Sequence, residues 1–263
     1  MSQFVQALQP KTPRQLFHYT KPANVINMLD LQRTSVCFWL KNNKDKNDEK
    51  ELKYGRELME KVRAYFQSKG QSSMLDQMTD FDNSYSASFT EGVLDAHMLS
   101  EYGTIRLEFD FREYEEQIYK CEYYSEEDLA ELYKVMIKDI QSLEGITKDS
   151  CYELKCAKIY KLFTIEMDLK AKIASIKLKD EWEREGEWRF VLHKQVNDER
   201  YFHDADGCER LKMFIPTAYL TGITLLYDNN TKEEIKALSK RIKDLRNWNR
   251  LGRFNVKLMR IKY

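Results

Sequence analysis

Short runs of strand-forming residues recur along the chain, separated by segments with helical spacing. In the run 104–109, Ile105, Leu107 and Phe109 alternate with polar residues, as expected of a strand with one buried face. We predict strands at 15–20, 35–40, 85–89, 104–109, 118–123, 186–193, 210–215, 222–227 and 255–261. The strands therefore fall into clusters rather than alternating steadily with helices.

Apolar residues spaced three and four apart predict helices at 22–31, 49–67, 95–102, 125–143, 150–176 and from 231 onward. Ser125-Glu126-Glu127-Asp128 and Thr231-Lys232-Glu233-Glu234 each resemble a capping box, in which the first hydroxyl bonds the backbone three residues later. The two central helices are interpreted as a helical insertion at 125–176 in a single domain spanning 1–263. Clustered strands and clustered helices favour an α+β fold.

Composition narrows the class of protein. With 42% hydrophobic residues, 13 Phe, 16 Tyr and 4 Trp, the chain of 263 residues has the means to bury a large core and is not expected to be disordered. No apolar run approaches the ~20 residues that span a bilayer, so no membrane partner is expected. The five cysteines are odd in number and lack Cys-x-x-Cys spacing. These features predict a protein of the reducing cytoplasm.

Charge is unevenly distributed, although the formal net charge is zero. From residue 236 to the end, ten Lys or Arg residues accompany a single acid, Asp244. A basic surface of this kind suits a phosphate-rich partner. A solvated helix followed by an edge strand with protective lysines explains the same residues more simply. Both interpretations stay open.

Several common kinds of site lack their sequence signals. The chain has neither Gly-x-x-x-x-Gly-Lys nor Gly-x-Gly-x-x-Gly, so the usual backbone cradles for phosphate are missing. The four histidines do not have metal-ligand spacing, and His203-Asp204-Ala205-Asp206 is interpreted as a polar turn. Cys151 and Cys156 are interpreted as small buried hydrophobes rather than nucleophiles. No metal site is predicted.

Two distant motifs place polar groups within apolar strands, where they are costly unless satisfied or used. One is His18-Tyr19-Thr20, and the other is Glu185-Gly186-Glu187-Trp188-Arg189. Glu185 and Glu187 share one face of a strand, where like charges repel unless they share a function or a cation. We therefore hypothesise one site containing both motifs. The simpler alternatives are a hydrogen-bonded core histidine and a Glu187 that pairs with Arg189 or a nearby lysine.

The strand 85–89 contributes a third element. Ser86, Ser88 and Thr90 share one side of it, so their hydroxyls are suited to brace a carboxylate from a neighbouring strand. The alternative is that these hydroxyls lie on the exposed face of a half-buried strand.

The chain resembles a widespread family of bacterial domains of unknown function, in which similar motifs follow one another in the same order. That resemblance covers roughly 16–227 and rests on His18-Tyr19-Thr20, Asn47-Asp48, Phe89-Thr90-Glu91, Leu99-Ser100-Glu101-Tyr102-Gly103 and Glu185-Gly186-Glu187-Trp188-Arg189. Two positions depart from the family pattern. Thr90 replaces the usual serine, and Leu99 replaces the usual tryptophan, which removes one expected wall of the site.

The family in turn resembles ADP-ribosyltransferases of the histidine–middle-strand–glutamate type, which implies a split β-sheet core and NAD as the substrate. By that resemblance, His18 with Tyr19 and Thr20 binds NAD, and Tyr102 stacks on nicotinamide. Ser86, Ser88 and Thr90 would form the middle-strand element. Glu187 would be the catalytic glutamate, and Glu185 would orient the acceptor.

The resemblance implies an NAD-dependent transferase that modifies a protein or nucleic acid, such as a toxin or an antiviral defence effector against phage. Two alternatives stay open: a non-catalytic module that binds a nucleotide or a protein, and an NAD glycohydrolase. The sequence does not identify the acceptor or the oligomeric state.

Overall fold

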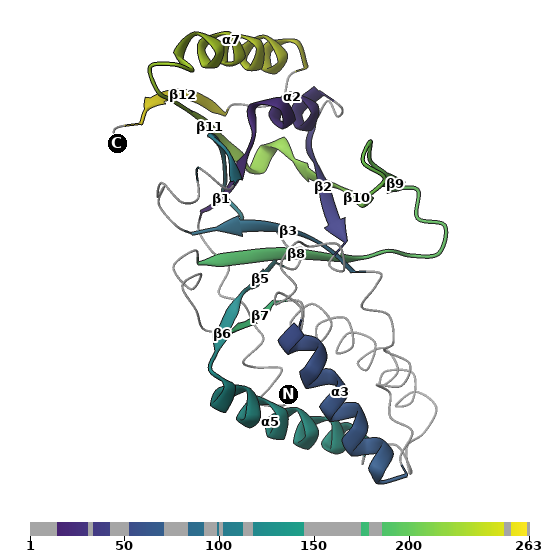
Figure 1. Ribbon diagram of the computed structural model, residues 1–263. Helices are drawn as coiled ribbons and strands as arrows, with labels where there is room; N and C mark the ends of the chain where they lie inside the picture. Colours follow the sequence, from purple (N-terminus) through teal and green to yellow (C-terminus); the bar gives the residue numbers. More distant parts are fainter. Residues whose placement is uncertain are drawn as a thin grey trace.

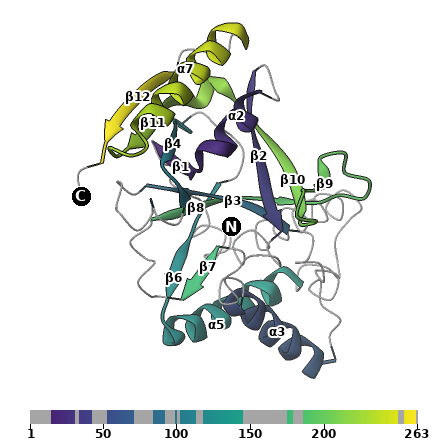
Figure 2. The same ribbon diagram turned by 45° about the horizontal axis from the view of Figure 1, so that its top comes forward.

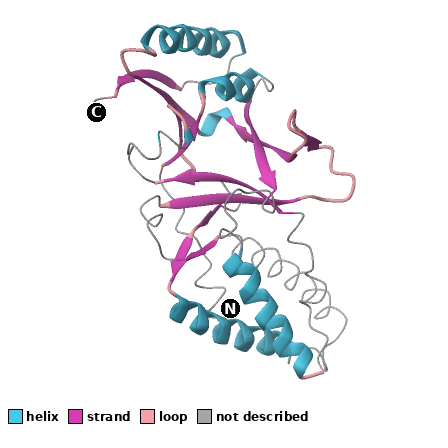
Figure 3. Ribbon diagram, in the orientation of Figure 1, coloured by secondary structure: helices cyan, strands magenta, loops and turns pink. Residues whose placement is uncertain are grey.

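Strand β3 (Ser84–Thr90) is the centre of the fold, because three other strands pair with it. The computed structural model describes residues 15–30, 34–42, 53–70, 84–91, 99, 102–112, 118–144, 175–178, 186–249 and 254–261. Within these residues, helices accompany one large, mostly antiparallel sheet and a second sheet of two strands (Figures 1 and 3).

The large sheet runs in the order β12-β11-β4-β1-β3-β2-β10-β9, with β8 added to β3 and β5 added to β8. Its strands are β1 (Leu16–Thr20), β2 (Ser35–Asn42), β3, β4 (Ile105–Phe109), β5 (Ile118–Lys120), β8 (Glu187–His193), β9 (Tyr201–His203), β10 (Glu209–Pro216), β11 (Leu220–Tyr227) and β12 (Asn255–Arg260). Strands β6 (Glu122–Tyr124) and β7 (Ile176–Leu178) form the small parallel sheet.

The large sheet divides at β3. Strand β8 pairs with β3 along its whole length and so occupies one edge. Strands β1 and β2 share the other edge, β1 at Thr90 and β2 at Tyr85 and Ser86. From there two arms diverge. We call β1-β4-β11-β12 the first arm and β2-β10-β9 the second arm.

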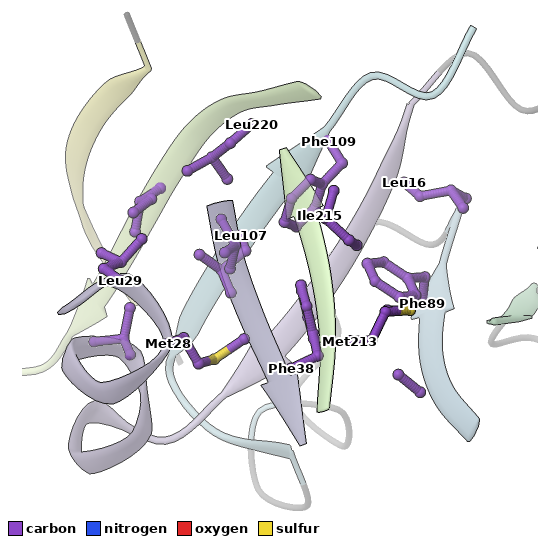
Figure 4. Close-up of a cluster of buried hydrophobic side chains, with 14 of the residues drawn as sticks. Leu16, Met28, Leu29, Phe38, Phe89, Leu107, Phe109, Met213, Ile215 and Leu220 are labelled. Atoms are coloured by element: carbon purple, nitrogen blue, oxygen red, sulfur yellow. The ribbon is translucent and has the colours of Figure 1, made fainter. Parts of the chain in front are cut away.

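Aromatic side chains fill the space between the arms. The ring of Phe89, on β3, lies within 6 Å of the rings of Phe38 and Phe109, which come from β2 and β4. Figure 4 shows these rings with aliphatic side chains from both arms, including Met213 and Leu107. Burial of this apolar cluster stabilises the junction of the two arms.

The helices lie on both sides of β3 and β8 (Figures 1 and 2). Helix α2 (Pro22–Asp30) connects the two arms, and α7 (Lys232–Asn249) covers β11 and β12. Helices α3 (Lys53–Ser68) and α5 (Glu126–Glu144) pack together with β6 and β7 on the other side. None of the described helices combines the length with the apolar composition needed to cross a bilayer.

The two predicted capping boxes have different outcomes. At α5 the box is confirmed: the Asp128 amide donates to the Ser125 hydroxyl at 3.1 Å, and the Ser125 amide donates to the Asp128 carboxylate at 3.2 Å. At α7 the predicted partner Glu234 is wrong. The Thr231 hydroxyl donates instead to Asp228, whose carboxylate also accepts the Thr231 amide. Asp228 is closer in sequence and forms a tight polar turn before the helix.

The predicted central insertion is only partly described. Its first helix is present as α5, whereas 145–174 lie outside the described residues. The predicted end of its second helix is wrong, because Ile176 begins strand β7 and pairs with Glu122. The predicted strand 118–123 divides into β5 and β6 at Cys121, whose amide donates to the Glu187 carbonyl.

Candidate functional site

Glu187, the first residue of β8, is a buried carboxylate with a cation at each oxygen. Its Oε1 accepts a 2.7 Å hydrogen bond from Nε of Arg189, and its Oε2 lies 2.5 Å from Nζ of Lys177. The Arg189 side chain is completely buried, and that of Lys177 is 13% exposed. The sequence alternative in which Glu187 pairs with Arg189 or a nearby lysine is therefore confirmed. Lys177 comes from β7, so its ion pair with Glu187 links the small sheet to the large one.

The register of β3 and β8 places the predicted hydroxyls beside this ion-pair cluster. Thr90 lies opposite Glu187, Ser88 opposite Arg189, and Ser86 two residues further along β3. Directly paired residues of antiparallel strands project from the same face. Both Thr90 and Ser86 are buried. The β3 hydroxyls therefore share a sheet face with a carboxylate from another strand, while their bracing of that carboxylate stays a prediction.

His18 lies on the opposite face of β3. Its imidazole packs against the rings of Phe38 and Phe89, with centroids 5.0 and 5.4 Å away. The Nδ1 atom lies 2.9 Å from the Ser88 carbonyl oxygen, to which it donates. Since Phe89 alternates with Ser88 and Thr90 along β3, the His18 ring belongs to the aromatic core rather than to the Glu187 face. The expectation that the two side chains meet in one site is corrected: their strands are brought together, but the side chains are not.

The other residues of the His18 motif divide between the two faces. Tyr19 is buried and pairs in register with Arg106 of β4. Thr20 is also buried, and its hydroxyl accepts a 3.4 Å hydrogen bond from the Asn24 amide in α2. Tyr102 is 41% exposed and precedes Gly103, where an added Cβ would lie 2.5 Å from the Thr20 carbonyl oxygen. Tyr102 thus lies near the end of β1.

Part of the predicted site falls outside the described residues, namely Glu185 and the Asn47-Asp48 pair. The backbone beside Glu187 is nevertheless informative. Gly186 has φ of +53°, and regular strand structure begins at Glu187. A left-handed residue turns the chain at this point, so the extended conformation predicted from residue 186 is not adopted by Gly186.

A second buried polar cluster was missed at the level of sequence. The Glu108 Oε1 atom accepts hydrogen bonds from the Thr224 hydroxyl and from Arg106, at 2.5 and 2.7 Å. Burial raises the pKa of Glu108, but these hydrogen bonds and the charges of Arg106 and Lys257 outweigh it and lower the pKa. Gly222 makes room, since a Cβ there would lie 2.9 Å from Glu108 Oε2.

This second cluster shares a face with Glu187. Register pairs connect Glu108 to Phe17, Phe17 to Thr90, and Thr90 to Glu187. The Arg106 guanidinium stacks on the Phe17 ring, 4.6 Å from its centroid. We call this row the polar strip. The sequence signal that points to it is Ile105-Arg106-Leu107-Glu108, where charges occupy alternate positions of a strand with a buried apolar face.

In the part of the chain that the structure describes, no group of three or more His, Cys, Asp or Glu side chains could hold a metal ion. The turn at His203-Asp204-Ala205-Asp206 is held by its own backbone, because Asp204 accepts from the amides of Asp206 and Cys208. Its carboxylate also pairs with Arg210 at 2.7 Å. The prediction of a polar turn is confirmed for these residues.

Comparisons with known proteins do not assign further residues to the site. The chain matches no protein-family model, and the searches of curated proteins and of solved structures also gave no match. The candidate site is therefore defined by its own geometry: a buried carboxylate, two cations and a row of hydroxyls on one face of β3 and β8.

Proposed function

We propose that the protein is an NAD-dependent ADP-ribosyltransferase in which Glu187 is the catalytic carboxylate. The observation that carries this proposal is the buried Glu187 side chain, oriented by Arg189 and Lys177 and facing the hydroxyl row of β3. The division of the sheet at β3 also supports it, since the resemblance of the motifs implies a split-sheet core.

The chemistry explains why such a carboxylate is useful. When nicotinamide departs, the remaining ribose has oxocarbenium character, and an ionised carboxylate at its 2′-hydroxyl stabilises that charge. The stabilisation is strong where water is excluded and where the carboxylate does not reorient during the reaction. Ion pairs from Arg189 and Lys177 restrict the orientation of Glu187 in this way.

The neighbouring residues take different roles in the proposal. Thr90 and Ser88 lie on the Glu187 face. In this proposal they contact the ribose or nicotinamide. His18 holds β1 against β3 from the other face and does not contact NAD. The acceptor is a protein or nucleic acid in the cytoplasm, as expected of a toxin or an antiviral defence effector, and Glu185 is assigned to its orientation.

The proposal is tested with Glu187→Asp, incubated with labelled NAD and cell lysate. The shorter side chain keeps the negative charge beside Arg189 and Lys177 but withdraws it from the ribose. We expect nicotinamide release to fall by about 10²–10³-fold. Glu209→Asp is the matched control, because Glu209 is a hydrogen-bonded carboxylate in the second arm. Unchanged turnover in a folded Glu187→Asp protein would exclude Glu187 as the catalytic residue.

A non-catalytic nucleotide-binding module is the second candidate. The position of His18 within the aromatic core favours it, because the histidine is then not available to the NAD face. Calorimetric binding of NAD without release of nicotinamide identifies this case. A third outcome, free ADP-ribose as the only product, identifies an NAD glycohydrolase.

A further inference from the structure

The second arm exposes one face of its sheet. From Phe38 onward in β2, and along β10, the side chains alternate between buried and accessible positions, whereas Cys37, the register partner of Phe214, is buried. The inward positions belong to the core, including Phe38, Leu40 and Met213. The outward positions carry Trp39, Lys41, Arg210, Lys212 and Phe214, and Phe202 of β9 joins them through its pairing with Arg210.

Aromatic rings dominate this outward face. Trp39 is 45% exposed and Phe214 is 36% exposed, although both side chains are large and apolar. The Trp39 ring meets the Phe202 ring edge to face, with centroids 5.1 Å apart. Exposed aromatic residues grouped on one sheet face indicate an interaction surface rather than incidental exposure.

Cations lie between these rings. Lys212 is the register partner of Trp39, and its Nζ atom lies 5.0 Å from the Phe202 ring centroid. Lys41 is exposed on the same face, two residues after Trp39 along β2. Arg210 is held by Asp204, so its charge is largely compensated. None of the six outward residues named above is acidic. The face is therefore aromatic and positively charged.

We propose that this face, formed by Trp39, Lys41, Phe202, Lys212 and Phe214, binds single-stranded nucleic acid. Unpaired bases stack on exposed aromatic rings, while lysines between the rings contact the phosphates of the same strand. The open face of an antiparallel sheet presents rings at intervals that successive bases can reach. A duplex keeps its bases stacked inside the helix and cannot use the rings.

The charge of the face selects nucleic acid over other occupants. A second copy of the chain would bring the same lysines together, and like charges repel across an interface. The proposal does not depend on NAD chemistry, since it concerns the second arm, whereas Glu187 lies on β8, and it is tested without NAD. It also locates nucleic-acid binding away from the basic C-terminal helix considered from sequence.

The test is fluorescence anisotropy with a labelled oligouridylate of about 12 nucleotides, within the site sizes of such surfaces. Trp39→Ala is expected to weaken binding by roughly 5- to 150-fold, the range for loss of one stacked base. Lys212→Gln should reduce the slope of log affinity against log salt by about 0.7, the value for one phosphate contact on a single strand. A matched duplex should bind more weakly than the single strand.

The double variant Lys240→Ala/Arg241→Ala is the matched control, because it removes two exposed cations from α7 and no aromatic ring. We expect its affinity to stay within about twofold of the parent protein. The proposal is overturned if the parent protein does not bind the oligonucleotide, if Trp39→Ala binds as well as the parent, or if only the α7 variant loses binding. It is also overturned if Trp39→Ala converts a dimer into a monomer without changing oligonucleotide binding.

Discussion

His18 occupies the gap that opens where β1 and β3 diverge. The two strands share the register pair Phe17 and Thr90, and beyond it the imidazole of His18 supplies the hydrogen bond to the Ser88 carbonyl. A side chain thus takes the place of a backbone partner. Burial lowers the pKa of His18, and the hydrogen bond to Ser88 offsets only part of that effect.

The first prediction concerns the titration of His18. Its pKa should lie below the ordinary value of 6.5, so the ring is neutral at pH 7. Near pH 6.5 the unfolded chain therefore binds a proton at His18, whereas the folded chain does not. Because the unfolded state binds more protons, the free energy of unfolding falls as the pH drops below that value. NMR titration of the ring proton and denaturation between pH 7.5 and 5.5 measure both effects. A His18→Asn variant should show a flatter pH dependence, and a ring that titrates at or above 6.5 contradicts the prediction.

At the scale of elements, the approach to β4 depends on a single glycine. Gly103 has φ of +112°, and a Cβ built on it would lie 2.5 Å from the Thr20 carbonyl oxygen. Backbone therefore touches backbone where the chain enters β4 beside the end of β1. Neither group can move without disturbing the pairing of the two strands.

The second prediction uses a pair of glycines. Gly103→Ala should destabilise the protein by more than the roughly 1–3 kcal/mol of left-handed backbone strain, because a steric clash adds to it. Gly207→Ala is the control: φ is also positive, but nothing lies within 4 Å of its added Cβ. Urea denaturation compares the two variants. Equal losses in free energy of unfolding would show that the contact with Thr20 is not decisive.

At the scale of the whole molecule, β3 separates an aromatic layer from a polar one. Phe89 forms ring contacts with residues of both arms, and Phe190 of β8 joins the same layer. On the other face, Glu187 connects β8 to β7 through Lys177. The candidate site therefore lies where the large sheet meets the small one. The proposed nucleic-acid surface is the outward face of the second arm, which points away from the aromatic core.

The third prediction follows from the central place of Phe89. Phe89→Ala should reduce the free energy of unfolding by about 3–5 kcal/mol, since it empties a site surrounded by other rings. Phe214→Ala should reduce it by only about 1 kcal/mol, because that ring is partly exposed and its removal leaves no enclosed cavity. Thermal or urea denaturation distinguishes the two. A small loss for Phe89→Ala would mean that the arms are held together by other contacts.

Much of the fold was predictable because it depends on local sequence. Strand-forming runs located β1, β2, β3, β4 and β8 to within about two residues, and the hydroxyl of Ser125 marked the start of α5. Alternation along β3 also grouped Ser86, Ser88 and Thr90 correctly on one side. Local patterns are reliable here because they reflect the backbone geometry of a single element.

The tertiary structure alone decided which side chains meet. Alternation shows which residues of one strand share a face, but not which face of the sheet that is, and a shift of one residue in register reverses the answer. For this reason His18 was expected beside Glu187 and lies instead in the aromatic core. For the same reason, the sequence allowed a lysine partner for Glu187 without identifying it as Lys177, and the row that connects Glu187 to Glu108 depends on the pairing of the strands.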